Sequence, residues 1–110
     1  MNYVFPELAT YKREWVPLLE AAKEWVKDYK VVYVCNALDF VAREYEDQGA
    51  EEAIKAAEAA KEIEDLIASA IKGYETVTEW YHTCQHRLTR PEQRVYRLAW
   101  IDHMIKECER

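Results

Sequence analysis

The chain has 110 residues, of which 50% are hydrophobic and 33% charged, and it contains only two glycines and three prolines. These values exclude an intrinsically disordered chain and favour one globular domain with few turns. The formal net charge is −6, yet residues 44–65 alone carry −7, with nine acidic residues against two lysines. We therefore expect a single all-α domain over residues 1–110, a compact bundle of four to five helices with an acidic local surface.

The number and spacing of the cysteines indicate the cellular compartment of the protein. Three widely spaced cysteines, Cys35, Cys84 and Cys108, are odd in number, and no apolar signal segment opens the chain. This favours a reducing cytoplasm over a disulfide framework. The longest run without a charged residue, 31–38, has eight residues, whereas a membrane-spanning helix needs about 20. We expect a cytoplasmic protein that makes no membrane contact.

The first part of the chain combines an arm with an amphipathic helix. Residues 1–10 form a short apolar arm that we expect to lie across the body of the protein. Pro17 is best tolerated in the first turn of a helix, so the first main helix is expected to begin near Val16, after a short turn or helix over residues 7–14. Its apolar stripe repeats at spacings of four and three: Tyr11, Trp15, Leu18, Ala22, Trp25 and Tyr29.

The stretch from Val31 to Tyr45 is apolar on nearly every side and is predicted to be the most buried element. Its β-branched start also fits a strand, but about fifteen residues without glycine or proline favour a helix. Asn36, Asp39 and Arg43 form one narrow polar edge. That edge is either a solvated strip of a central helix or, for Asn36 and Asp39, a surface that faces a partner or pocket.

Residues 50–72 give the clearest helical pattern, which lies between Gly49 and Gly73 and is rich in alanine, glutamate and lysine. Small residues in its first half would allow a neighbouring helix to approach closely. The outward strip is expected to hold Glu51, Glu58, Glu62 and Asp65. The acidic segment 44–65 is also a candidate contact surface, because a row of carboxylates can occupy a partner's nucleic-acid site.

Two further helices are predicted after Gly73. The first covers residues 76–88. The second begins after a capping box of Thr89 and Glu92, with an inner face of Val95, Leu98, Ile101, Ile105 and Cys108. Tyr96 and Trp100 lie four residues apart and away from that face.

No constellation for catalysis or metal binding stands out. His82 and His86 share a helical face, which can bind a metal, but Cys84 points away from both and no second Glu-x-x-His motif completes a di-metal site. Ser69 is the only serine, and no glycine-rich loop is present to bind a phosphate. We expect no enzyme, no metal and no cofactor.

The remaining candidates are aromatic and arginine side chains. Arg87, Arg90, Arg94 and Arg97 are spaced three, four and three residues apart, which would suit phosphate contacts. Pairing with the acidic helix, or a charged face in water, is the favoured explanation of this row. The fourteen aromatic residues fit either a core filled with large side chains or a docking surface. The predicted partner-binding residues are Trp80, Tyr81, Arg90, Arg94, Tyr96, Arg97 and Trp100, with Asn36 and Asp39 as a second group.

Several short stretches, VCNALD (34–39), AIKGY (70–74) with VTEW (77–80), and RLAWID (97–102), resemble small uncharacterised all-helical proteins of tailed phages. The resemblance implies a cytosolic protein made in an infected bacterium and supplies no activity. We therefore expect a non-enzymatic protein-binding module that modulates or inhibits a host protein, such as a defence component. One alternative is a nucleic-acid-binding protein that uses the Arg87–Arg97 row, although a pI of 5.1 argues against it. The other alternative is a self-associating homodimer.

Overall fold

A computed structural model describes residues 5–28, 33–71 and 90–110. These residues form four α-helices, α1 (Val16–Asp28), α2 (Val34–Glu44), α3 (Ala50–Ala70) and α5 (Arg90–Glu109), and two 3-10 helices, η1 (Arg13–Trp15) and η2 (Tyr45–Gln48). The described residues contain no strand, so the predicted all-α class is confirmed. The helix expected over 76–88 and the Thr89 cap lie outside the described residues.

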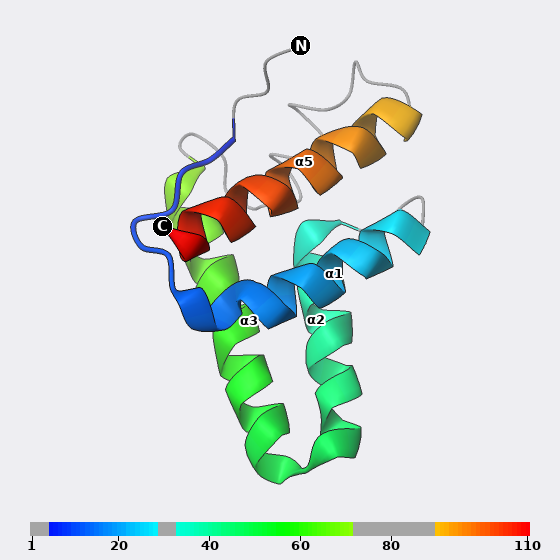
Figure 1. The fold of residues 1–110 in the computed structure, drawn as a ribbon, viewed down its shortest axis with the longest axis vertical. Helices are drawn as coiled ribbons and strands as arrows, with labels where there is room; N and C mark the ends of the chain where they lie inside the picture. The colour runs from blue at the N-terminus through cyan, green and yellow to red at the C-terminus, as the bar shows by residue number, and fades with distance from the viewer. Residues whose placement is uncertain (1–4, 29–32, 72–89) are drawn as a thin grey trace.

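The helices are arranged as two antiparallel pairs (Figure 1). α1 and α5 pack against each other and run in opposite directions, and α2 and α3 form a hairpin that crosses this pair. α1 also packs against α2, so the packing order is α5, α1, α2 and α3. The turn of the α2–α3 hairpin lies far from the α1–α5 pair (Figure 1).

α1 begins where the proline predicted it would. Lys12 is extended, η1 follows, and Pro17 occupies the first turn of α1, where its missing N–H costs no intrahelical hydrogen bond. The buried side chains of α1 form a stripe at three- and four-residue spacing: Leu18, Leu19, Ala22 and Val26. Polar contacts add to this packing, since Lys23 pairs with Asp102 of α5 at 2.7 Å.

α2 is as buried as the sequence predicts. Val34, Ala37, Leu38 and Val41 are all in the core. The ring of Phe40 lies 5.0 Å from that of Trp25 on α1, and the Trp25 indole N–H donates to the Glu44 carboxylate.

The turn between η2 and α3 depends on Gly49. Its φ is +126°, a backbone conformation that strains any residue with a Cβ, although no neighbouring atom crowds the position. α3 then buries the predicted apolar line through Ala56, Ala60, Ile63 and Ile67. Its acidic strip stays outside, and Ile54 is 58% exposed beside it.

The inner face of α5 agrees with the prediction at Ile101 and Cys108, which are buried, and differs from it at Val95, which is 52% exposed. Tyr96, Trp100 and Met104 are buried as well. Val95 and Trp100 point to different sides of the helix, so the helix cannot bury both side chains. Burying the indole of Trp100 removes far more apolar surface from water than burying Val95, and this difference sets the orientation of α5.

The N-terminal arm lies across α5, as expected for the residues that are described. The Phe5 ring is 5.1 Å from the ring of Tyr96 and 5.3 Å from that of His103. The Glu7 carboxylate contacts His103 Nε2 at 2.7 Å and accepts a hydrogen bond from the Tyr11 hydroxyl at 2.9 Å. Burial raises the pKa of Tyr11 to about 12, so its hydroxyl stays protonated and available to donate.

In the part of the chain that the structure describes, no helix combines the length and the apolar character needed to cross a bilayer.

The orientation of α5 can be tested with two substitutions on that helix. Trp100→Ala removes a fully buried side chain and is expected to lower the free energy of unfolding by about 3 kcal/mol or more. Val95→Ala removes an exposed one and is expected to cost less than about 0.5 kcal/mol. Urea denaturation followed by tryptophan fluorescence and circular dichroism measures both, and equal costs would contradict the observed orientation.

Candidate protein-binding face on the outer side of α3

The acidic segment lies on the outer side of the α2–α3 hairpin. Glu51, Glu52, Glu58 and Asp65 of α3 are exposed, and Glu46 and Asp47 of η2 extend the charged surface around the turn. The two lysines of the segment already have carboxylate partners. Lys55 lies 3.3 Å from Glu51 and Lys61 lies 3.7 Å from Asp65. Such exposed pairs contribute about 0–1 kcal/mol each, so this surface keeps a strong negative potential.

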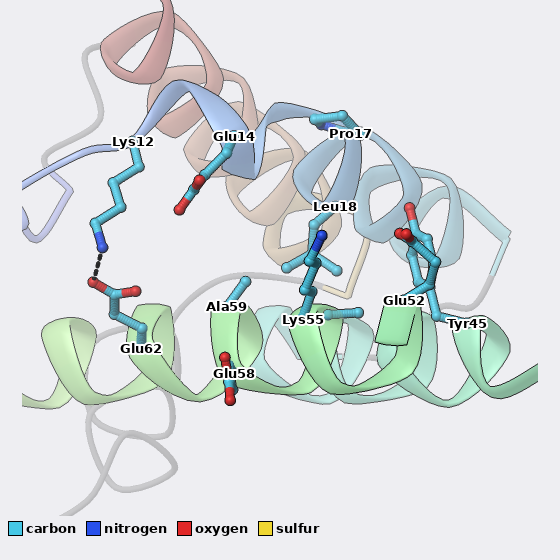
Figure 2. A pocket seen from close by; sticks show the side chains of 11 residues that line it. Lys12, Glu14, Pro17, Leu18, Tyr45, Glu52, Lys55, Glu58, Ala59 and Glu62 are labelled. Carbon is cyan, nitrogen blue, oxygen red and sulfur yellow. Dashed lines mark ion pairs between the residues drawn. The ribbon is translucent and has the colours of Figure 1, made fainter. Parts of the chain in front are cut away.

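A groove of about 510 Å³ separates this side of α3 from η1 and the start of α1. Figure 2 shows Glu14 reaching from η1 toward α3, while Lys55, Ala59 and Glu62 rise from α3 in the opposite direction. Leu18, Pro17, Ala56, Ala59 and the half-buried Tyr45 supply apolar surface. The groove therefore has a mixed lining, in which apolar side chains alternate with charged ones.

One end of the groove is closed by an ion pair. Lys12 Nζ lies 2.7 Å from the Glu62 carboxylate, and this contact raises the pKa of Lys12 (Figure 2). Glu14, Glu52 and Glu58 make no ion pair with any of the described residues. Glu52 and Glu58 therefore have no cation paired with them in the described chain, and Glu14 interacts with Lys12 without forming an ion pair.

A second acidic feature joins α2 to α3. Glu64 of α3 has a buried Oε1 that meets no hydrogen-bond donor, and it lies against Asp39 of α2. Burial and the nearby Asp39 carboxylate raise the pKa of Glu64 to about 8. The raised pKa favours the protonated form of Glu64 near neutral pH, and in that form Glu64 can donate a hydrogen bond to the Asp39 carboxylate.

Cys35 lies one helical turn before Asp39. Burial, assisted by the Glu64 and Asp39 carboxyl groups, raises the pKa of Cys35 to about 12. The thiol is therefore protonated at neutral pH and is a poor nucleophile.

The structure separates the predicted partner-binding residues. Asn36 and Asp39 are exposed on α2, and Arg94 is half-buried on α5 beside a groove of about 710 Å³ between α1 and α5. Trp80 and Tyr81 lie outside the described residues, as does the side chain of Arg90, the first residue of α5.

Tyr96, Arg97 and Trp100 are not on the surface, which corrects their assignment to an exposed contact site. Trp100 is fully buried, and Tyr96 and Arg97 are 8% and 4% exposed. The Arg97 guanidinium lies 4.6 Å from the centroid of the Tyr33 ring, which suits a cation–π contact. These residues are buried for the same reason that Val95 is exposed: α5 turns the side with its largest side chains toward the core.

Two features of the site were not identified from the sequence. The contact between Asp39 and Glu64 depends on how α2 and α3 are aligned, and no local pattern encodes that alignment. Glu14 belongs to the groove only because η1 packs beside α3. Ile54, in contrast, lies off the predicted apolar line of its helix, so a helical wheel would have placed it on the acidic side.

Among the residues that the structure describes, no group of three or more His, Cys, Asp and Glu side chains is placed to hold a metal ion. The metal-binding candidates from the sequence lie outside the described residues: His82, Cys84 and His86. Comparison of the chain with protein-family models, with curated proteins and with solved structures gives no match.

The raised pKa of Glu64 beside Asp39 predicts a specific pH dependence of stability. Unfolded Glu64 loses its proton near its ordinary pKa of 4.5, whereas native Glu64 keeps it up to about pH 8. The native state holds more protons between these values, so the contribution of this pair is fully present below the lower pKa and is lost as pH rises through the higher one. Because Glu64 is partly exposed, solvent screening reduces the size of the effect.

Glu64→Gln keeps a donor toward Asp39 at every pH. The variant is expected to match the wild type near pH 4.5 and to be more stable by on the order of 1 kcal/mol at pH 9. Thermal and urea unfolding at several pH values measure the difference. Asp65→Asn, a neighbouring exposed acid, is the control, and the same pH profile in both variants would contradict the raised pKa of Glu64.

Proposed function

We propose that this protein is a non-enzymatic protein-binding module whose contact surface is the acidic outer side of α3. The observation that carries the proposal is the exposure of Glu51, Glu52, Glu58 and Asp65 on one helix, with Ile54 among them. Charges of one sign on one surface steer a partner of opposite charge and fix its orientation, and an exposed aliphatic side chain supplies apolar contact. The partner is therefore a protein with a basic surface.

The resemblance to small proteins of tailed phages supports a host bacterial protein as the partner. A row of carboxylates along a helix can occupy a basic site that otherwise receives the phosphates of a nucleic acid. Binding there would block or modulate the host protein without any chemistry in this chain. A defence component with a nucleic-acid site is a partner of this kind.

Direct binding of nucleic acid receives less support. It relied on a row of arginines that includes Arg97, and Arg97 is buried over Tyr33. Arg94 remains half-buried at the edge of a groove that also contains Glu24 and Asp28. The carboxylates beside Arg94 would repel a phosphate backbone.

The proposal is tested by capture of a partner from bacterial lysate on tagged protein, with and without nuclease, read by mass spectrometry. The wild type is expected to retain a basic protein after nuclease treatment. Glu58→Lys combined with Asp65→Lys reverses the charge of two exposed residues of α3 and is expected to weaken retention about tenfold or more.

The matched control reverses the same amount of charge on α1. Glu20→Lys combined with Glu24→Lys changes two exposed acids away from α3 and is expected to retain the partner. Equal loss with both variants, capture that disappears with nuclease, or a wild type that only forms homodimers would each overturn the proposed surface.

A further inference from the structure

We propose that the groove between α3 and η1–α1 is the site that receives the partner, and that it binds an amphipathic basic segment: a helix with lysine or arginine flanking an aliphatic side chain. This inference rests on the proposed function and assigns the chemistry of the ligand. It is carried by the size of the groove, by the apolar side chains within its mixed lining, and by the carboxylates around it that form no ion pair in the described chain.

The groove has the size and depth for side chains of a peptide. Its volume of about 510 Å³ lies within the range of about 300–1,000 Å³ that is typical of ligand sites. Leu18 is buried at the base of the groove. Ala56 and Ala59 leave space along α3 because neither side chain extends beyond a methyl group. An aliphatic side chain placed there would lose water-exposed surface against apolar atoms on both walls.

The charged residues that line the groove favour a positively charged ligand. Both lysines that line it already contact carboxylates, Lys12 that of Glu62 and Lys55 that of Glu51. Glu52 and Glu58 on the α3 side form no ion pair in the described chain, and Glu14 on the η1 side interacts with Lys12 only at longer range than an ion pair. A cationic ligand would therefore find acceptors on both walls without breaking an existing ion pair.

The positions of these carboxylates fit a helical ligand. Glu52 and Glu58 are six residues apart and lie on opposite edges of the α3 strip that lines the groove, about 9 Å apart along the helix axis. Basic residues roughly two turns apart on a bound helix span a similar length and leave the apolar residues between them over Ala56 and Ala59. A nucleic acid or an acidic peptide would instead meet three repelling carboxylates.

The probe for the test is a synthetic peptide of about 14 residues with leucine on one helical face and lysine on the other. Its titration into ¹⁵N-labelled protein, followed by amide chemical shifts, is expected to saturate. The shifts are expected to concentrate at Glu14, Leu18, Lys55 and Ala59. The same peptide with glutamate in place of lysine is expected to cause no saturable shift.

Two charge-reversal variants distinguish binding in the groove from general attraction by the acidic surface, and a third variant fills the groove. Glu52→Lys combined with Glu58→Lys is expected to weaken peptide binding about tenfold or more. Glu46→Lys combined with Asp47→Lys makes the same charge change on η2, outside the groove, and is expected to weaken it about threefold at most. Ala59→Phe fills the groove without a change of charge and is expected to abolish binding, provided that circular dichroism shows the native helix content.

Two outcomes would overturn the inference. Equal weakening by the two charge pairs would show that only long-range attraction acts, and shifts confined to α5 or to the α1–α5 groove would place the ligand elsewhere. Either result leaves the acidic surface of α3 to be judged by partner capture alone. If Ala59→Phe loses the peptide but retains the captured partner, the groove is a peptide site and the partner uses another part of α3.

Discussion

The structure depends on the burial of α1 between two neighbours. Leu18, Leu19, Ala22 and Val26 are all in the core, and the helix packs against α5 on one side and α2 on the other. Ala22 has no exposed surface and a side chain of one methyl group, which allows the neighbouring helices to approach α1 closely. Trp15 and Trp100 add the largest apolar areas to the same core. Loss of this packing would separate the α1–α5 pair from the hairpin.

This arrangement leaves α3 as the outermost helix in the packing order. It is held mainly through α2 and η2, so its buried line of Ala56, Ala60, Ile63 and Ile67 needs only one side of the helix. The opposite side carries exposed acidic residues: Glu51, Glu52, Glu58 and Asp65. The fold therefore separates two tasks: the large aromatic residues that are described stabilise the core, and the charged residues of α3 are presented to solvent. The proposed binding function uses the second of these surfaces.

Local features of the fold could be predicted from the sequence because they depend on few neighbouring residues. Pro17 indicated where α1 begins, Gly49 indicated where the η2–α3 turn lies, and the spacing of alanine and isoleucine indicated the buried side of α3. The face that α5 buries could not be predicted, because that helix has apolar residues on two sides and only packing against α1 decides between Val95 and Trp100. The helical spacing that places alanine and isoleucine on the buried side of α3 also places the acidic strip on its exposed side.

The contents of the candidate site were harder to predict. Its acidity is visible in composition, but the groove exists only because η1 lies beside α3, and the contact of Asp39 with Glu64 requires a particular alignment of α2 and α3. The choice of exposed aromatics as the contact residues was wrong for Tyr96 and Trp100, because a helix of mixed composition buries its largest apolar side chains first.

The most direct measurement of the central claim is hydrogen–deuterium exchange on the protein alone and on the complex purified with its captured partner. Binding is expected to slow exchange in peptides that cover α3 and η1, while the outer side of α5 exchanges at an unchanged rate. Protection confined to residues 90–110, with α3 unaffected, would contradict the claim that the acidic side of α3 is the contact surface.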